Sequence, residues 1–370
     1  MATRTVAFLS PLFFDEECYI GGGERYPTNL AKGIAFASGG EYRVEIISFS
    51  TTSRLVKLAR GVDLRLIKRA RRPSNPLDVV SWEILDAFAG ADLVHIQQAY
   101  TRCSEVGILA ARQLGRPICV TDHGGTSSTL GSEIDHLELV DRIVAQSQFA
   151  ADQFETRRPI SLVPGGVDAE LFRPPIRRPK RDRFLFVGRI LPHKGVDVLL
   201  KALPKGLPLT ICGRPYSEDY YRKVIKLCAG KDVQIITDAD DETIQSLYAR
   251  AWATVLPSVY RDCYDTVYRA PELMGFTLLE AMACGTPAIC SRVGGMPEFV
   301  REGNTGFVFD SPEELADQLL SLANNPELVE TLGRQAREVV EQEYDLAVAG
   351  RRLVAIYDDL LKTRSSEAAA

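Results

Sequence analysis

Residues 184–203 read FLFVGRILPHKGVDVLLKAL: a short apolar run that ends in Gly-Arg, then a loop, then a second apolar run. The first run is rich in Phe, Leu and Val, which is typical of a buried strand. The sequence therefore predicts a strand, a loop that carries Arg189 and Lys194, and a helix that begins near Gly195. A strand followed by a helix is the repeating unit of parallel α/β structure.

The same alternation of β-branched runs and helical patterns continues in both directions along the chain. Further strands are predicted at 6–10, 44–50, 62–67, 93–97, 117–124, 142–147, 209–213, 233–237, 253–258 and 287–291. Between the two halves, LFRPPIRRPKRDR contains prolines that no strand interior or helix tolerates. We therefore predict an N-terminal Rossmann-like domain over 1–172, a linker over 173–182 and a second Rossmann-like domain over 183–344.

The last stretch, 345–370, is predicted to form an amphipathic helix from about Leu346 to Lys362. Apolar residues recur there at helical spacing, which favours packing, and we expect the helix to lie against the N-terminal domain. The tail after it, RSSEAAA, is expected to be disordered.

The composition is that of an ordinary soluble globular protein. The chain has 370 residues, 45% hydrophobic and 25% charged, with a net charge of −5, so a nucleic-acid partner is not expected. We find no signal-peptide pattern and no run of about 20 apolar residues, and we expect a cytoplasmic protein. Two basic stretches, LFRPPIRRPKRDR at 171–183 and KRARRPSNP at 68–76, are each either a solvated connector or a peripheral contact with the inner membrane face, and both readings are open.

The eight cysteines include no C-x-x-C pair and no zinc-ligand spacing. Buried thiols are therefore expected rather than a disulfide framework or a metal site.

Two motifs of the first half fall where parallel sheets bind ligands, after a predicted strand. Gly21, Gly22 and Gly23 open a predicted helix, whose N–H groups could meet a phosphate; a flexible loop without a ligand is the alternative. His123 follows an apolar strand and could reach a sugar hydroxyl, or it could be a structural histidine. We expect His95 to be a packed strand residue and His136 to lie on a helix surface.

The second half supplies cations at the corresponding positions. Arg189 ends a strand and Lys194 precedes a helix, so both could face one pyrophosphate; the alternative is two solvated side chains. Gly213 and Arg214 end another strand, and Arg214 is either a ligand contact or a surface residue.

The stretch from Pro271 to Gly285, PELMGFTLLEAMACG, holds two carboxylates eight residues apart. If both lay on one helix, the rise would separate Glu272 from Glu280 by roughly 12 Å. That is too far for one bond, so the two would serve different ends of a long ligand.

Taken in order, these motifs resemble those of the family-4 retaining glycosyltransferases of the GT-B fold. The resemblance runs through GGGER, TDHGG, PGGVD, GRILPHKG, ICGRP, the Glu-x7-Glu segment, GTPAICSRVGGMPEFV and NTGFVF. It implies an α/β chain with two doubly wound Rossmann-like domains facing across a cleft, the first on the acceptor side and the second on the donor side.

The resemblance also implies an activity: transfer of a hexose-type sugar, with retention, from a nucleoside diphosphate sugar to an acceptor hydroxyl. UDP and GDP sugars are favoured as donors, and neither a cofactor nor a metal is expected. The acceptor is a glycan, a lipid or a small molecule. A nucleotide-sugar 2-epimerase and a non-catalytic sugar-binding protein are the alternatives.

Residue roles carry over from the resemblance in the same way. The catalytic set is His123 for positioning, Arg189 and Lys194 for the leaving diphosphate, and Glu272 for the donor sugar. Glu280 is assigned to the ribose of the nucleotide. The other donor-binding residues are Gly21, Gly22, Gly23, Gly213, Arg214, Met274, Gly275, Phe276 and Thr277.

One segment departs from the family pattern, because residues 259–271 are longer than the usual turn. Their tyrosines could form a lid or an acceptor wall, and a plain surface excursion is the other possibility.

Overall fold

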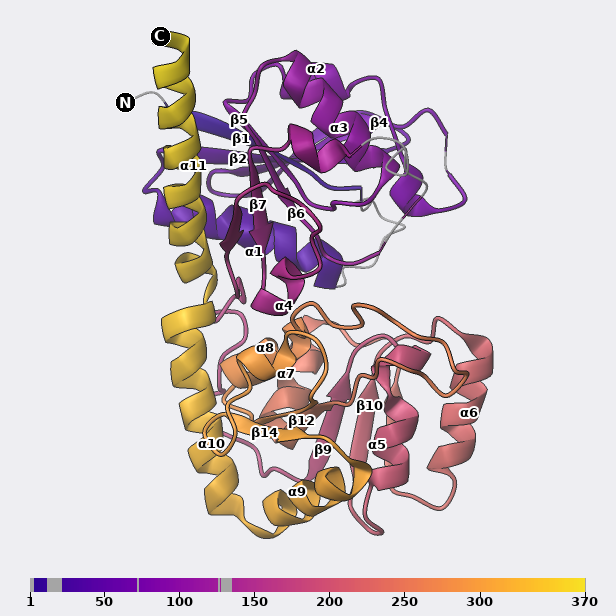
Figure 1. Cartoon of the computed structure of the whole chain (residues 1–370). Coiled ribbons are helices and arrows are strands. Elements are labelled where there is room, and N and C mark those ends of the chain that lie inside the picture. Colours follow the sequence, from indigo (N-terminus) through magenta and orange to yellow (C-terminus); the bar gives the residue numbers. More distant parts are fainter. Residues whose placement is uncertain (1–2, 12–21, 72, 126, 128–134, 370) are drawn as a thin grey trace. The chain divides into compact units, whose positions relative to one another are not determined.

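The computed structural model describes residues 3–11, 22–71, 73–125, 127 and 135–369 (Figure 1). The chain forms two compact units. The first consists of the chain up to Gly166 together with Leu346 onwards, and the second spans Val167–Asp345. Residues 173–182, predicted as a linker, therefore belong to the second unit.

The first unit is built on an eight-stranded sheet with the order β3-β4-β2-β1-β5-β6-β7-β8. Only β3 runs antiparallel to its neighbour. The strands are β1 Arg4–Leu9, β2 Tyr42–Ser50, β3 Arg54–Ala59, β4 Val62–Lys68, β5 Leu93–Ile96, β6 Ile118–Thr121, β7 Arg142–Ala145 and β8 Ile160–Leu162. The helices are α1 Gly22–Ala37, η1 Pro76–Asp78, α2 Ile84–Phe88, α3 Arg102–Gln113, η2 His136–Leu139, α4 Gln148–Ala151 and α11 Leu346–Ala369.

The second unit is built on a six-stranded parallel sheet with the order β11-β10-β9-β12-β13-β14. Its strands are β9 Arg183–Val187, β10 Leu209–Cys212, β11 Val233–Ile236, β12 Ala251–Leu256, β13 Ala288–Ser291 and β14 Gly306–Phe309. Its helices are η3 Pro192–Lys194, α5 Val196–Ala202, α6 Glu218–Cys228, α7 Asp241–Arg250, α8 Phe276–Ala283, η4 Met296–Glu298, α9 Pro312–Asn324, α10 Pro326–Val339 and the π-helical turn η5 Val340–Tyr344.

Each sheet is doubly wound, and each has a point at which the strand order reverses. The chain leaves β9 in one direction to form β10 and β11, then returns to the other side of β9 to form β12. In the first unit the reversal lies between β1 and β5. Loops diverge at such a point, on the edge where the parallel strands end, and leave room for a ligand there.

Burial explains the near-continuous apolar strands. Phe184, Leu185 and Phe186 of β9 are fully buried, as expected for parallel strands covered by helices on both faces. The seven cysteines that the structure describes are unpaired, and five of them are buried: Cys103, Cys119, Cys212, Cys284 and Cys290.

Helix α11 packs against α1 in the first unit (Figure 1). The two backbones meet at Gly33, where a Cβ atom would lie 2.1 Å from the carbonyl oxygen of Leu346. The Tyr357 hydroxyl lies 2.6 Å from His95 Nδ1, in the core of this unit. The expectation of a disordered tail after Lys362 is wrong, because α11 continues to Ala369; this stretch contains alanines and no helix breaker.

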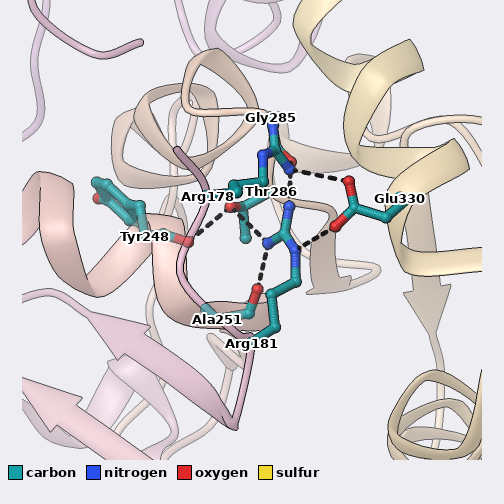
Figure 2. A network of polar contacts seen from close by, with 7 residues as sticks. All are labelled: Arg178, Arg181, Tyr248, Ala251, Gly285, Thr286 and Glu330. Atoms are coloured by element: carbon teal, nitrogen blue, oxygen red, sulfur yellow. Dashed lines mark hydrogen bonds and ion pairs between the residues drawn. The ribbon is translucent and has the colours of Figure 1, made fainter. Parts of the chain in front are cut away.

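The segment predicted as a solvated connector instead places a buried arginine inside the second unit (Figure 2). Arg181 is 8% exposed, and its guanidinium donates to Gly285 O (2.7 Å), Thr286 Oγ1 (3.1 Å), Ala251 O and Glu330 Oε1 (3.0 Å). Five donors in a fixed fork let a single side chain join these separate pieces of backbone.

Within the described residues, no helix is at once long and apolar enough to cross a lipid bilayer.

We expect Arg181→Ala to lower the free energy of unfolding of the second unit by about 3 kcal/mol or more, because it leaves buried carbonyl groups without a donor. Arg178 is the matched control: it also donates to Gly285 O (3.0 Å), but its side chain is 26% exposed. Arg178→Ala should cost about 1 kcal/mol. Chemical denaturation measures both, and equal losses would contradict a special role for Arg181.

Candidate active site

The loops that follow β9 and β10 are packed against each other where these strands end. The amide of Ile190 donates to Arg214 O (2.7 Å), and a Cβ atom on Gly213 would lie 1.8 Å from Gly188 O. Glycine at 213 is thus required by the close approach of two backbones. The packing brings Arg189 and Arg214 onto adjoining loops.

The two predicted cations lie in different surroundings. Arg189 is exposed, and its guanidinium carbon lies 5.9 Å from the centre of the Tyr216 ring. The side chain of Lys194, at the end of η3, is only 13% exposed, and its Nζ forms an ion pair with Glu272 Oε1.

Glu272 is held from several sides and is 7% exposed. In addition to Lys194, the Ser258 hydroxyl donates to its Oε1 (2.8 Å). The amide of Gly295 donates to its backbone carbonyl (3.1 Å). The Lys194–Glu272 ion pair was not predicted from the sequence, because 78 residues separate its two members. Ser258 was not predicted as a site residue either.

Glu280 lies on α8, whereas Glu272 precedes that helix. The 12 Å estimate therefore does not apply, since it assumed one helix for both. Glu280 is 4% exposed and accepts a hydrogen bond from the Tyr248 hydroxyl (3.1 Å). The Thr286 hydroxyl in turn donates to the Tyr248 carbonyl (2.7 Å). The polar network in Figure 2 therefore includes Tyr248, the hydrogen-bond partner of Glu280.

The N-terminus of α8 has no side-chain cap. Its N-cap residue, Gly275, has φ 89°, and a Cβ atom there would come within 2.8 Å of Met296 Cγ. The Met274 side chain is buried, so this residue can offer a ligand only its backbone, while Phe276 and Thr277 are half-buried. An uncapped helix start presents a positive end to an anion.

His193, next to Lys194 on η3, is a further residue near these groups that was not predicted from the sequence. Burial lowers its pKa to about 4, helped by the charges of Lys194 and Arg189 and opposed by that of Glu272. The ring is neutral at pH 7 and lies 4.8 Å, centre to centre, from that of Tyr268.

The long segment 259–271 folds back onto the second unit. Asp262 accepts hydrogen bonds from the Tyr268 hydroxyl (2.9 Å) and the Tyr264 amide (2.8 Å). The Gly294 amide donates to the Tyr260 hydroxyl (3.0 Å), and the Val259 amide donates to His193 O (2.9 Å). The segment is therefore anchored beside Lys194, Ser258 and Glu272, which together we call the Glu272 cluster. Its role as a lid or acceptor wall stays a prediction.

In the first unit, His123 lies near the start of α1. Its Nε2 is 3.1 Å from Gln97 Oε1, and its ring centre is 4.9 Å from that of Tyr26 on α1. Burial lowers its pKa to about 3, so the ring is neutral at pH 7. Gly22 and Gly23 form the first turn of α1, while Gly21 lies outside the described residues.

Asp122 fixes the loop that carries His123. Its carboxylate accepts hydrogen bonds from the amides of Ala99 (3.1 Å) and Gly124 (3.2 Å). Burial raises its pKa to about 6, and the backbone donors partly offset this rise. Neither Gln97 nor Asp122 was predicted as a site residue from the sequence, although Asp122 is adjacent to the predicted His123.

For the two other histidines of this unit, the structure confirms one prediction and contradicts the other. His95 is a packed strand residue, as predicted, with its Nε2 2.8 Å from Thr121 Oγ1. His136 is not on a helix surface: it is buried in η2, and its Nε2 lies 2.9 Å from Ala99 O.

A cavity of about 280 Å³ adjoins the Glu272 cluster, and Ser258 and Tyr260 are among its lining residues. None of the predicted site residues lines it, so the candidate site is defined by the cluster and not by this cavity. Within the described part of the chain, no group of three or more His, Cys, Asp or Glu side chains could hold a metal ion. Metal independence stays a prediction.

A strand-loop-helix site with paired cations and carboxylates on a doubly wound sheet is an arrangement suited to transferring a group from a phosphorylated donor. The family model described as Glycosyltransferase Family 4 matches residues 20–171, and that described as Glycosyl transferases group 1 matches 168–339. The chain belongs to glycosyltransferase family 4 and has the GT-B fold.

Curated and solved relatives agree with this assignment. The D-inositol 3-phosphate glycosyltransferase of Streptomyces avermitilis is 28% identical over 91% of this chain and 84% of its own. Two structures share the fold: HepE of Anabaena in complex with UDP and glucose (17% identity, TM-score 0.75, 96% of this chain and 100% of that one), and sucrose-phosphate synthase of Thermosynechococcus elongatus (21%, 0.72, 97% and 100%).

The Lys194–Glu272 pair should appear in the stability of the unliganded protein. Lys194→Met leaves a carboxylate buried without its counter-charge, and we expect a loss of about 3 kcal/mol. Adding Glu272→Gln should recover part of that loss, because the uncompensated charge disappears. Denaturation of both single variants and the double variant measures the coupling, and losses that add within about 0.5 kcal/mol would show that the two do not interact.

Proposed function

We propose that this glycosyltransferase moves a hexose-type sugar from a nucleoside diphosphate sugar to an acceptor hydroxyl with retention of configuration. UDP and GDP sugars are the favoured donors, and no metal or cofactor is involved. The observation that carries the proposal is the buried Lys194–Glu272 pair beside the uncapped start of α8. The complexes of HepE with UDP and with UDP-glucose support a nucleotide-sugar donor by analogy.

The ion pair suggests how the donor engages the site. In the unliganded protein Lys194 and Glu272 neutralise each other. We propose that a donor diphosphate takes Lys194 as its counter-charge, which leaves the Glu272 carboxylate free to accept hydrogen bonds from sugar hydroxyls. The positive end of α8 and the exposed Arg189 add to the charge that meets the diphosphate.

Bond cleavage then increases negative charge on the leaving phosphate oxygen. Cations already in place stabilise this charge more in the transition state than in the ground state, which accelerates the reaction. Their placement could do the work that a metal ion does elsewhere. Glu280, held by Tyr248, is proposed to accept hydrogen bonds from the ribose, and Gly213, Arg214, Met274, Gly275, Phe276 and Thr277 to complete the donor site.

No residue is proposed as a covalent nucleophile. The acceptor would attack the face from which the nucleotide leaves, and the departing phosphate would take the acceptor's proton. His123 is neutral and half-buried, and we assign it a positioning role toward the sugar or acceptor. Gly21, Gly22 and Gly23 are proposed to offer N–H groups at the start of α1.

Nucleotide binding is the first test of the donor. UDP or GDP, with a chelator present, should raise the melting temperature, since a hundredfold excess over the dissociation constant adds about 2.7 kcal/mol of stability. Glu280→Gln should weaken binding by about 1.5 to 3 kcal/mol through the loss of charged hydrogen bonds. Glu313→Gln, an exposed change on α9, is the control and should bind as the wild type does. No shift with any nucleoside diphosphate would overturn the proposed donor class.

Turnover tests the roles of the cations. Arg189→Ala and Lys194→Ala should each lower kcat more than they weaken binding of the nucleotide, because the charge they meet grows during bond breaking. Lys205→Ala, which removes an exposed cation of the same unit, should leave kcat unchanged. Full turnover by either site variant would remove that residue from the mechanism, and NMR of the product's anomeric configuration decides between retention and inversion.

A further inference from the structure

The charge of the chain is distributed very unevenly. Residues 54–72 contain eight basic side chains and one acidic one, Asp63, which gives this stretch a net charge of +7. The whole chain carries −5, so the remaining residues carry −12. The basic residues are Arg54, Lys57, Arg60, Arg65, Lys68, Arg69, Arg71 and Arg72.

The structure places most of these cations on the outermost hairpin of the first unit, β3–β4. Arg65 is paired with Glu45 and Asp63 with Arg43, so the only acid of the stretch is already neutralised. Five other cations are exposed and form no ion pair with any residue that the structure describes: Arg54, Lys57, Arg60, Lys68 and Arg71. Their charge is therefore available to a partner.

Large apolar side chains are exposed in the same place. Leu55, Val56 and Leu58 of β3 are 58%, 37% and 37% exposed. Trp82 is 93% exposed and is held beside the hairpin by its neighbours. The Ser81 hydroxyl donates to Lys68 O (2.6 Å) at the end of β4, and Glu83 Oε2 accepts from the Ser53 hydroxyl (2.7 Å) just before β3.

We name this surface, made of residues 54–60, Lys68, Arg71 and Trp82, the basic edge. Single exposed apolar residues need no explanation. Cations on an edge strand also protect it from pairing with another chain. That protection explains Lys57, but it requires neither the cations beyond the hairpin nor an exposed tryptophan.

Charge identifies the kind of partner. A second copy of this chain would bring an equal positive charge to the contact, which disfavours a symmetric dimer through this edge. An anionic lipid surface complements both features, because cations meet the headgroups while Trp and Leu side chains enter the boundary region. We propose that the basic edge docks the first unit onto a bilayer that contains anionic lipids.

Vesicle co-sedimentation tests this docking. The wild type should bind phosphatidylcholine vesicles that contain phosphatidylglycerol, should bind pure phosphatidylcholine far more weakly, and should be released by high salt. Each cation near the surface contributes about fivefold in affinity, so Arg54→Gln/Lys57→Gln should bind about 25-fold more weakly. The matched control, Arg351→Gln/Lys362→Gln, neutralises two exposed cations of α11 in the same unit and should bind as the wild type does.

Tryptophan emission gives a second, local readout. The chain has two tryptophans, so in a Trp252→Phe background the emission reports Trp82 alone. Anionic vesicles should shift this emission to the blue as the ring leaves water, and Trp82→Ser in the wild-type chain should weaken sedimentation. The nucleotide-induced melting shift should persist in every basic-edge variant, so failure of docking is distinguishable from failure of the proposed donor site.

Several outcomes would overturn the proposal. Binding that does not depend on phosphatidylglycerol, or an equal loss in the α11 control, would remove the basic edge as the docking surface. Aggregation of the Arg54→Gln/Lys57→Gln variant with unchanged lipid binding would show that these cations protect the edge strand instead. Binding of a nucleic-acid duplex without binding of vesicles would assign the surface to a different polyanion.

Discussion

The buried guanidinium of Arg181 is the interaction on which the order of the second unit depends. It joins the start of β12, at Ala251, to the turn that ends α8, at Gly285 and Thr286, and to Glu330 of α10. Because Thr286 also holds Tyr248, which holds Glu280, the position of a proposed ribose contact follows from this arginine. A charge so deeply buried costs desolvation, and its hydrogen bonds to fixed carbonyls offset that cost only when the geometry is right. Hydrogen bonds, and not only apolar packing, therefore connect Glu280 of the candidate site to the interior of the second unit.

Much of the fold could be predicted from the sequence because buried parallel strands carry a strong local signal. β9 and β10 are short, mostly apolar strands that are each followed by a glycine, and both were predicted. β3 was missed because RLVKLA is exposed along its length and shows no buried face. Arg181 was missed for the opposite reason: arginine among prolines indicates a solvated connector, and only the folded chain supplies the carbonyls that pair with it. His136 shows the same limit, because a buried carbonyl at Ala99 determines its place.

The candidate site divides in the same way. Arg189, Lys194, Glu272 and Glu280 could be selected because each lies within a recognisable motif. Arg189 and Lys194 follow a strand, Glu272 precedes α8, and Glu280 lies on that helix. Their partners could not be selected, because Ser258 follows β12 and Tyr248 lies on α7, and neither belongs to a motif of its own. The Lys194–Glu272 ion pair adds something that the motif does not indicate, because the two charges already neutralise each other in the structure. In the proposed mechanism, a diphosphate would therefore replace Glu272 as the partner of Lys194 rather than simply add a contact.

The second unit is, in terms of chain order, an insertion within the first. Helix α11 follows Asp345, yet it packs on α1 and places Tyr357 against His95 in the core of the first sheet. A nascent chain can therefore complete the second unit from contiguous sequence, whereas the first unit waits for α11, which is synthesised after the whole of the second. Closing a contact across so long a separation is entropically slow. Until α11 arrives, the face of α1 that it covers has no partner, and exposed apolar surface of this kind makes a folding chain prone to aggregation.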